Sequence, residues 1–198
     1  MKDGVPQRWN HNLHYHRVVL EKMPKHCLRV LDVGCGEGML VRDLSAPRRR
    51  VTGIDVDAAS IASAREQEPS AEYFCADFLT HPFRETSFDA VVSVAALHHM
   101  DPETALRRMS ELLRPGGSLV VIGCARSDLP RDLPYELAAF AANKWISRSR
   151  TYWEHHAPTV WPPGQTYREM RRLAARVLPG SKFRRHLLWR YSISWTKP

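Results

Sequence analysis

The sequence has few cysteines, and their spacing does not match that of zinc-binding or disulfide-rich motifs. Four occur among the 198 residues, and no two of them form a C-x-x-C pair. Zinc sites built from cysteine need closely spaced cysteines, and disulfides need an oxidising compartment. We therefore expect Cys27, Cys35, Cys75 and Cys124 to be reduced residues of the core.

Long apolar segments are also missing. No stretch of 18 apolar residues occurs, and the first residues, MKDG, lack the apolar region of a secretory signal. Internal repeats and flexible linkers are absent as well. We expect a soluble, cytoplasmic protein that does not contact membranes. Its length suits one domain, since roughly 100–200 residues per domain is usual.

Acidic residues are too few to balance the basic ones. The chain has 29 Lys and Arg against 21 Asp and Glu, a net charge of +8. The excess lies late in the chain, at Arg168, Arg171, Arg172, Arg176, Lys182, Arg184, Arg185 and Arg190. The spacing of Arg168, Arg172 and Arg176 predicts one helix face. A solvated face is the favoured interpretation, and a phosphate or RNA site is the alternative.

The chain is organised around residues 30–38, VLDVGCGEG. The apolar run with its valines predicts a buried strand, and the three alternating glycines indicate a tight turn into a helix. Glycine is required where φ is positive or where a ligand touches the backbone. We therefore expect a small polar ligand at the carboxyl end of this strand.

The next predicted strand, VTGID at 51–55, ends in a carboxylate that suits both hydroxyls of a ribose. The glycine spacing is G-x-G-x-G, not the G-x-G-x-x-G of dinucleotide sites, and Glu37 would repel a diphosphate. A ribose without a pyrophosphate suggests a nucleoside ligand.

These two segments, together with CADF at 75–78, resemble motifs I to III of class I S-adenosylmethionine-dependent methyltransferases. The resemblance runs from about residue 28 to residue 123. It implies S-adenosyl-L-methionine as cofactor and a Rossmann-like α/β fold: a doubly wound, mostly parallel seven-stranded sheet with an antiparallel terminal hairpin. The implied cofactor-binding residues are Asp32, Gly34, Cys35, Gly36, Gly38, Asp55, Val56, Asp77, Phe78 and Ser93.

Within that set, the resemblance places Asp77 near the adenine amino group and Phe78 or Val56 against the faces of the base. A turn-forming aspartate is the alternative for Asp77.

Periodicity and capping residues predict the remaining elements. Helices are expected at about 18–23, 39–45, 58–67, 102–114, 133–147 and 166–178, the third capped by Asp57 and the fourth by Asp101. Further strands are expected at 72–75, 88–94, 118–123, 183–188 and 191–195. We expect an N-terminal cap (1–27), a cofactor-binding core (28–124), an acceptor lid with aromatic residues at 152–161 (125–165), and a terminal helix and hairpin (166–198).

Four histidines are candidate general bases. Methyl transfer is an in-line displacement, so positioning dominates, but a hydroxyl or ammonium acceptor must also lose a proton. Histidine suits this role near neutral pH. His98 and His99 follow strand 88–94, and His14 and His16 belong to the polar segment WNHNLHYH at 9–16. A carboxylate acceptor would need no base.

Other roles remain open for these histidines. The N-terminal segment is equally consistent with a structural cap, His98 with packing or cofactor contact, and His99 with a surface position. A metal site is not expected, because the spacing H-x-x-H-x-H of His11, His14 and His16 matches no helical pair.

The favoured function is methylation of a small-molecule acceptor at oxygen, nitrogen or a carboxylate. An RNA methyltransferase is the alternative suggested by the basic C-terminal part, although no recognition module is apparent and nucleic acid is not the expected partner. A cofactor-binding protein without methyl transfer comes third, and a nicotinamide oxidoreductase last. No feature of the sequence specifies an oligomeric state.

Overall fold

The computed structural model describes residues 10–24, 26–148 and 162–198. The aromatic segment expected at 152–161 lies outside these residues. The elements in order are α1 (His11–His14), α2 (His16–Lys22), β1 (Arg29–Val33), α3 (Met39–Leu44), β2 (Arg50–Asp55), α4 (Ala58–Gln67), β3 (Glu72–Cys75), β4 (Phe88–Val94), the 3-10 helix η1 (Leu97–His99), α5 (Pro102–Leu112), β5 (Leu113–Gly123), α6 (Leu133–Ser147), α7 (Tyr167–Val177), β6 (Lys182–His186) and β7 (Arg190–Thr196).

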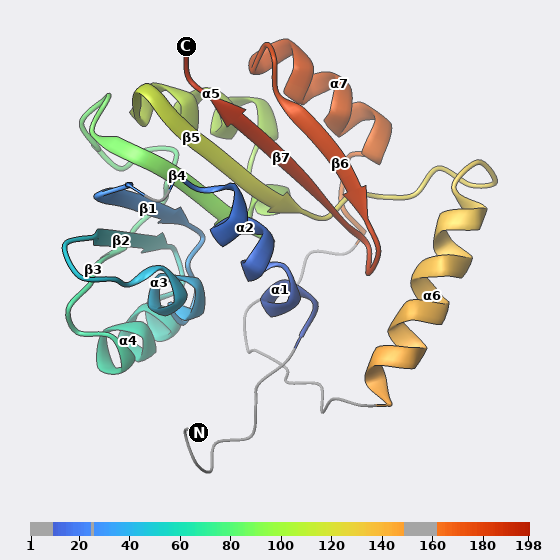
Figure 1. Ribbon diagram of the computed structural model, residues 1–198, viewed down its shortest axis with the longest axis horizontal. Helices are drawn as coiled ribbons and strands as arrows, with labels where there is room; N and C mark the ends of the chain where they lie inside the picture. The colour runs from blue at the N-terminus through green and yellow to red at the C-terminus, as the bar shows by residue number, and fades with distance from the viewer. Residues whose placement is uncertain (1–9, 25, 149–161) are drawn as a thin grey trace.

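The strands form one sheet in the order β3-β2-β1-β4-β5-β7-β6 (Figure 1). Strands β1 to β5 pair in parallel, whereas β7 runs antiparallel to both β5 and β6. A connection of three residues between β6 and β7 permits no other pairing, because parallel neighbours need a long crossover. The doubly wound, mostly parallel seven-stranded sheet with an antiparallel hairpin is therefore confirmed.

Alternating strand residues bury the two faces of the sheet against different helices. On β1, Val30 packs in the cluster that contains α2, α3 and α4, whereas Leu31 packs in the cluster that contains α5 and α7. Figure 1 shows these two layers, with α6 standing beyond the β6 edge. Because parallel strands are covered on both sides, they read as continuous apolar runs.

Local capping explains where several helices begin. The Asp57 carboxylate accepts the backbone N–H of Ser60 at 3.0 Å, and that of Asp101 accepts the N–H of Thr104 at 2.9 Å. Both helix starts were expected from these residues and are confirmed. Thr166 and Glu169 form a reciprocal capping box at the start of α7.

The junction of α5 and β5 differs from the sequence prediction. Helix α5 ends at Leu112 instead of Arg114, and β5 begins at Leu113 instead of Ser118. Leu113 pairs with Phe88, and the register then shifts before Ser118 pairs with Ala90. Proline disfavours a helical residue before it, so the segment after Leu113 forms an irregularity in the strand.

Two smaller predictions also need correction. One short helix was expected before the first strand, but two are present, α1 and α2, because the Asn10 side chain caps an additional helical turn. Cys27, Cys35 and Cys124 are buried free thiols as expected, but Cys75 is exposed. It is the last residue of β3, which forms an edge of the sheet.

Among the described residues, no helix is long and apolar enough to cross a membrane.

The start of β1 is held by a buried carboxylate of β4. Asp89, 5% exposed, accepts the backbone N–H groups of Leu28 at 2.6 Å and Arg29 at 3.1 Å. It also pairs with the half-exposed Arg114 at 2.9 Å. These two hydrogen bonds are partly buried, whereas the ion pair involves a half-exposed Arg114, so we expect this carboxylate to stabilise the junction more through the backbone than through the ion pair.

Replacing Asp89 therefore tests that junction. We expect Asp89→Ala to lower the free energy of unfolding by about 2–4 kcal/mol, because two backbone donors lose their acceptor. Arg114→Ala, which removes the exposed partner alone, should cost less than about 1 kcal/mol. Urea denaturation followed by circular dichroism measures both variants. Equal losses would contradict the backbone explanation.

Candidate functional site

A cavity of about 590 Å³ opens at the carboxyl ends of β1, β2 and β4. Strands β1 and β4 are neighbours from which the chain leaves in opposite directions along the sheet, the usual ligand position in doubly wound folds. Its lining includes Asn10, Asn12, Leu13, His16, Asp32, Val33, Gly34, Cys35, Gly36, Glu37, Ile54, Asp55, Val56, Asp57, Asp77, Phe78, Ala95, Ala96, His99, Met100 and Asp101.

The three glycines after β1 serve different purposes. All have positive φ, at 73° for Gly34, 50° for Gly36 and 72° for Gly38. A Cβ at Gly34 would lie 2.1 Å from the Cβ of Ala96, and one at Gly38 would lie 2.7 Å from the Tyr73 hydroxyl. At Gly36 it would meet no atom within 4 Å. Packing therefore requires Gly34 and Gly38, while Gly36 presents bare backbone to the cavity.

The Asp55 carboxylate holds the glycine turn against β2. One oxygen accepts the Gly36 N–H at 2.8 Å, and the other accepts the Asp57 N–H at 3.0 Å. The backbone N–H of Gly34 bonds to the carbonyl of Ile54 at 2.8 Å. Each carboxylate oxygen has further acceptor capacity, so Asp55 can support the turn and still bind ribose hydroxyls.

Asp32 places an unsatisfied carboxylate oxygen beside the cavity. Its side chain is buried, and Oδ2 has no hydrogen-bond partner among the described residues. Burial, with a smaller contribution from Asp55, raises the pKa of Asp32 to about 8. A ligand that brings a cation or a hydrogen-bond donor would satisfy this oxygen. The orphaned oxygen and the bare backbone at Gly36 fit a nucleoside that carries a cationic group.

The residues expected around an adenine lie at the same cavity. Val56 is 69% exposed at its rim, Phe78 is buried in its wall, and Asp77 lies beside them. The Asp77 carboxylate also accepts the N–H of Leu79 at 2.8 Å, so it shapes a turn as well as lining the cavity.

Residues of α1 and α2 also line the cavity. The buried Asn10 side chain caps α1 by accepting the N–H groups of Asn12 and Leu13 at 3.0 and 2.9 Å. Asn12 in turn accepts a hydrogen bond from Arg190 of β7 at 2.7 Å. The polar residues of this segment are therefore satisfied by the protein while they line the cavity.

Two of the four candidate histidines reach the cavity. His16 is buried, and its Nδ1 lies 2.6 Å from the Asp43 carboxylate of α3. This contact leaves Nε2 as the ring nitrogen available to a ligand. His99 also lines the cavity and is exposed, and partial burial lowers its pKa.

The other two histidines do not line the cavity. His14 is exposed, with its ring against the edge of Tyr15. His98 packs beside His99, and burial lowers its pKa to about 4, with smaller contributions from His99 and Arg190. A base with so low a pKa would bind a proton weakly near neutrality.

Two of the expected cofactor residues also lie behind the lining. The Ser93 hydroxyl is buried and donates to the carbonyl of Val33 at 2.8 Å. Gly38 packs against Tyr73. Cys35 does line the cavity, and burial raises the pKa of its thiol, which keeps it protonated.

Several lining residues were not predicted from the sequence. Asn10 carried a usable signal, since asparagine before a helical turn is a common cap. Ala95 carried no such signal in the sequence, because its φ of 55° is unusual for alanine and arises from the turn after β4. Within the described part of the chain, no three His, Cys, Asp or Glu side chains are grouped to hold a metal ion.

Comparison with known proteins agrees with this geometry. Residues 31–121 match the model of a family described as a methyltransferase domain. The chain is 38% identical to an uncharacterized methyltransferase of Mycobacterium tuberculosis over 98% of its own length and 100% of that protein. It is 32% identical to a malonyl-[acyl-carrier protein] O-methyltransferase of Enterobacter lignolyticus, over 64% of this chain and 53% of that protein.

A solved structure is similar in fold. The crystal structure of a SAM-dependent methyltransferase from Aquifex aeolicus superposes with a TM-score of 0.64 at 15% identity, covering 92% of this chain and 89% of that one.

The different surroundings of the glycines predict that substitution of Gly36 weakens ligand binding, whereas substitution of a glycine outside the cavity changes stability alone. Gly36→Ala should weaken binding of S-adenosylhomocysteine about tenfold or more, because the methyl group would enter the cavity. Its positive φ should also cost about 1–2 kcal/mol of stability. Gly180→Ala is the matched control, since Gly180 has a φ of 83° and open space around a Cβ but lies outside the cavity. Calorimetry measures the affinity of each variant for S-adenosylhomocysteine, and thermal unfolding measures its stability. Equal affinities in Gly36→Ala and Gly180→Ala would contradict the assignment of Gly36 to ligand binding.

Proposed function

Because the chain belongs to the class I S-adenosylmethionine-dependent methyltransferase family, we propose that it methylates a small-molecule acceptor held between the cofactor and helices α1 and α2. The chain is a methyltransferase whose cofactor is S-adenosylmethionine. The acceptor class is the proposal. We also propose that residues 1–27 act as a cap, 28–124 as the cofactor-binding core, 125–165 as an acceptor lid, and 166–198 as the terminal helix and hairpin.

One observation carries this proposal: a single cavity is lined both by the glycine turn and by the N-terminal helices. Gly36 and Asp55 line it together with Asn12 and His16. Its volume of about 590 Å³ falls within the range of ~300–1,000 Å³ usual for small-molecule sites. Such a space suits a nucleoside-sized cofactor with a small acceptor rather than a folded macromolecule.

The chain's own residues suit the expected cofactor. Asp55 would accept hydrogen bonds from the ribose, Phe78 and Val56 would contact the base, and Asp32 would face a cationic group. When bound, S-adenosylmethionine supplies an electrophilic methyl group on a sulfonium. The remaining task of the protein is to align the acceptor, exclude water and, where required, remove a proton.

His16 is the residue best placed to remove that proton. Asp43 contacts Nδ1, which would orient the ring and favour the tautomer with Nε2 free to accept a proton. The same arrangement of carboxylate, imidazole and reacting group serves other enzymes that activate hydroxyl nucleophiles. We therefore propose an acceptor that loses a proton, such as a hydroxyl or an amine, with His16 as its general base.

A carboxylate acceptor is the second candidate. It is motivated by the malonyl-[acyl-carrier protein] O-methyltransferase that resembles about two thirds of this chain. A carboxylate is already nucleophilic, so His16 would then serve to position it rather than to accept a proton.

The acceptor class is tested by following the methyl group. Purified protein is incubated with S-adenosylmethionine labelled in its methyl group and with either a metabolite extract or total RNA. Mass spectrometry then identifies the labelled product. Label in a small molecule supports the proposal, whereas label in RNA alone, or none in either pool, overturns it.

The role of His16 generates a sharper prediction. His16→Ala should lower kcat by about 10²–10⁴-fold, because a general base contributes that much to proton transfer. Affinity for S-adenosylhomocysteine should change little, since His16 is not among the proposed cofactor contacts. His14→Ala is the matched control, two residues away and outside the cavity, and it should keep most activity.

A conservative variant distinguishes loss of the general base from loss of local structure. His16→Asn retains a polar side chain of similar size but cannot act as a base near neutral pH, so it should be as impaired as His16→Ala. Activity retained in His16→Asn would exclude proton removal by His16 and favour the carboxylate acceptor.

A further inference from the structure

A second cavity, of about 510 Å³, lies between the N-terminal end of α6, helix α7 and strand β6. Its walls are rich in arginine and share no residue with the cavity at the carboxyl ends of β1, β2 and β4. The lining residues are Asp128, Arg131, Asp132, Tyr167, Arg168, Arg171, Arg172, Ala175, Phe183 and Arg185. We call it the arginine cavity.

Three of these arginines lie on one face of α7. Arg168, Arg171 and Arg172 are spaced at i, i+3 and i+4, so their guanidinium groups are neighbours on the helix surface. Like charges at this spacing destabilise a helix. Arg176, expected on the same face, instead pairs with Glu103 of α5 at 2.5 Å. None of the three in the cavity forms an ion pair with a described residue.

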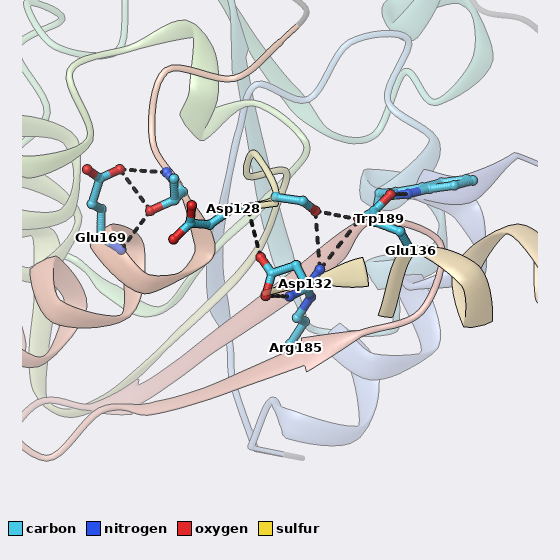
Figure 2. Close-up of polar contacts among 8 residues, drawn as sticks. Asp128, Asp132, Glu136, Glu169, Arg185 and Trp189 are labelled. Atoms are coloured by element: carbon cyan, nitrogen blue, oxygen red, sulfur yellow. Dashed lines mark hydrogen bonds and ion pairs between the residues drawn. The ribbon is translucent and has the colours of Figure 1, made fainter. Parts of the chain in front are cut away.

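Three carboxylates in or near the cavity already have partners, as Figure 2 shows. Asp132 pairs with Arg185 at 2.8 Å. Glu136 lies 3.5 Å from the same guanidinium and accepts the indole N–H of Trp189 at 2.8 Å. Glu169 is occupied by the capping box with Thr166. Among described residues, Asp128 alone lines the cavity with a carboxylate that makes no ion pair.

Arg185 forms a fixed part of the cavity wall. Its guanidinium carbon lies 3.9 Å from the ring centroid of Tyr167 and 4.2 Å from that of Tyr135, and the side chain is 14% exposed. Two aromatic rings and two carboxylates therefore hold this group in place. Because its charge is compensated, the remaining positive charge of the cavity belongs to Arg131 and the three arginines of α7.

We propose that the arginine cavity binds the phosphate group of a small-molecule phosphate ester. Arg131, Arg168, Arg171 and Arg172 are exposed and form no ion pair with a described residue, and Asp128 is the one lining carboxylate that is likewise unpaired. The cavity therefore carries a net positive charge that a multiply charged anion would balance. Guanidinium groups match the oxygens of phosphate in bidentate geometry and bind it more specifically than lysine would. The cavity is large enough to hold the phosphate and an organic group attached to it.

The experiment measures binding to the full chain by calorimetry at constant ionic strength, without S-adenosylmethionine. The probes are pyrophosphate, glycerol 3-phosphate and a single-stranded RNA of random sequence. The test variant is Arg168→Gln/Arg172→Gln, since glutamine keeps the helix propensity and removes two charges. The control is Arg29→Gln/Arg84→Gln, which removes two exposed arginines outside both cavities.

We expect both phosphate compounds to bind the unmodified protein, and the test variant to bind them about tenfold or more weakly. The control variant should bind them unchanged. Failure of both compounds to bind, or equal losses in the two variants, would overturn the proposal, because the attraction would then be absent or unspecific. Binding of RNA without binding of either small compound would also overturn it and indicate a surface for nucleic acid.

Discussion

The close approach of two backbone turns at the centre of the sheet is the constraint on which the cavity at the carboxyl ends of β1, β2 and β4 depends. After β1 the chain turns at Gly34, and after β4 it turns at Ala96, where a Cβ on Gly34 would lie 2.1 Å from that of the alanine. Both turns use left-handed backbone, at Gly34 and at Ala95. A larger residue at either contact would separate β1 from the loop that carries His99, and the cavity between them would change shape.

The elements that sequence reasoning identified depend on local chemistry. Glycines with positive φ, and helix caps such as Asp57 and Asp101, act within a few residues, so they can be recognised without a structure. The resemblance to methyltransferases added the doubly wound, mostly parallel seven-stranded sheet with its antiparallel terminal hairpin. Where a boundary depends on a distant partner, prediction failed: β5 starts early because Leu113 pairs with Phe88.

Part of the candidate site could also be predicted, namely the part that depends on residues at the ends of strands. The turn at Gly34 and Gly36 and the carboxylate of Asp55 meet at one cavity, as their positions at strand ends suggested. The histidines could not be ranked, because the contact that distinguishes His16 comes from Asp43, 27 residues later. Helical spacing likewise grouped Arg176 with Arg168, although a glutamate on α5 pairs with Arg176.

The two cavities have opposite charge although the chain as a whole is basic. The carboxyl groups that line the first are those of Asp32, Glu37, Asp55, Asp57, Asp77 and Asp101. An acidic environment suits a sulfonium cation, and an arginine-rich one suits an anion. Because the two linings share no residue, this separation of charge would keep each ligand from the other's cavity.

Contact between the two ends of the described chain has a consequence for how the protein is made. The Asn12 side chain binds Arg190, and the Tyr15 hydroxyl donates to the carbonyl of Leu187, so α1 and α2 rest on the hairpin. A ribosome delivers these partners about 170 residues apart. Until the hairpin emerges, the side chains of Asn12 and Tyr15 lack these partners. Docking of α1 and α2 on the hairpin is therefore a late event of biosynthesis.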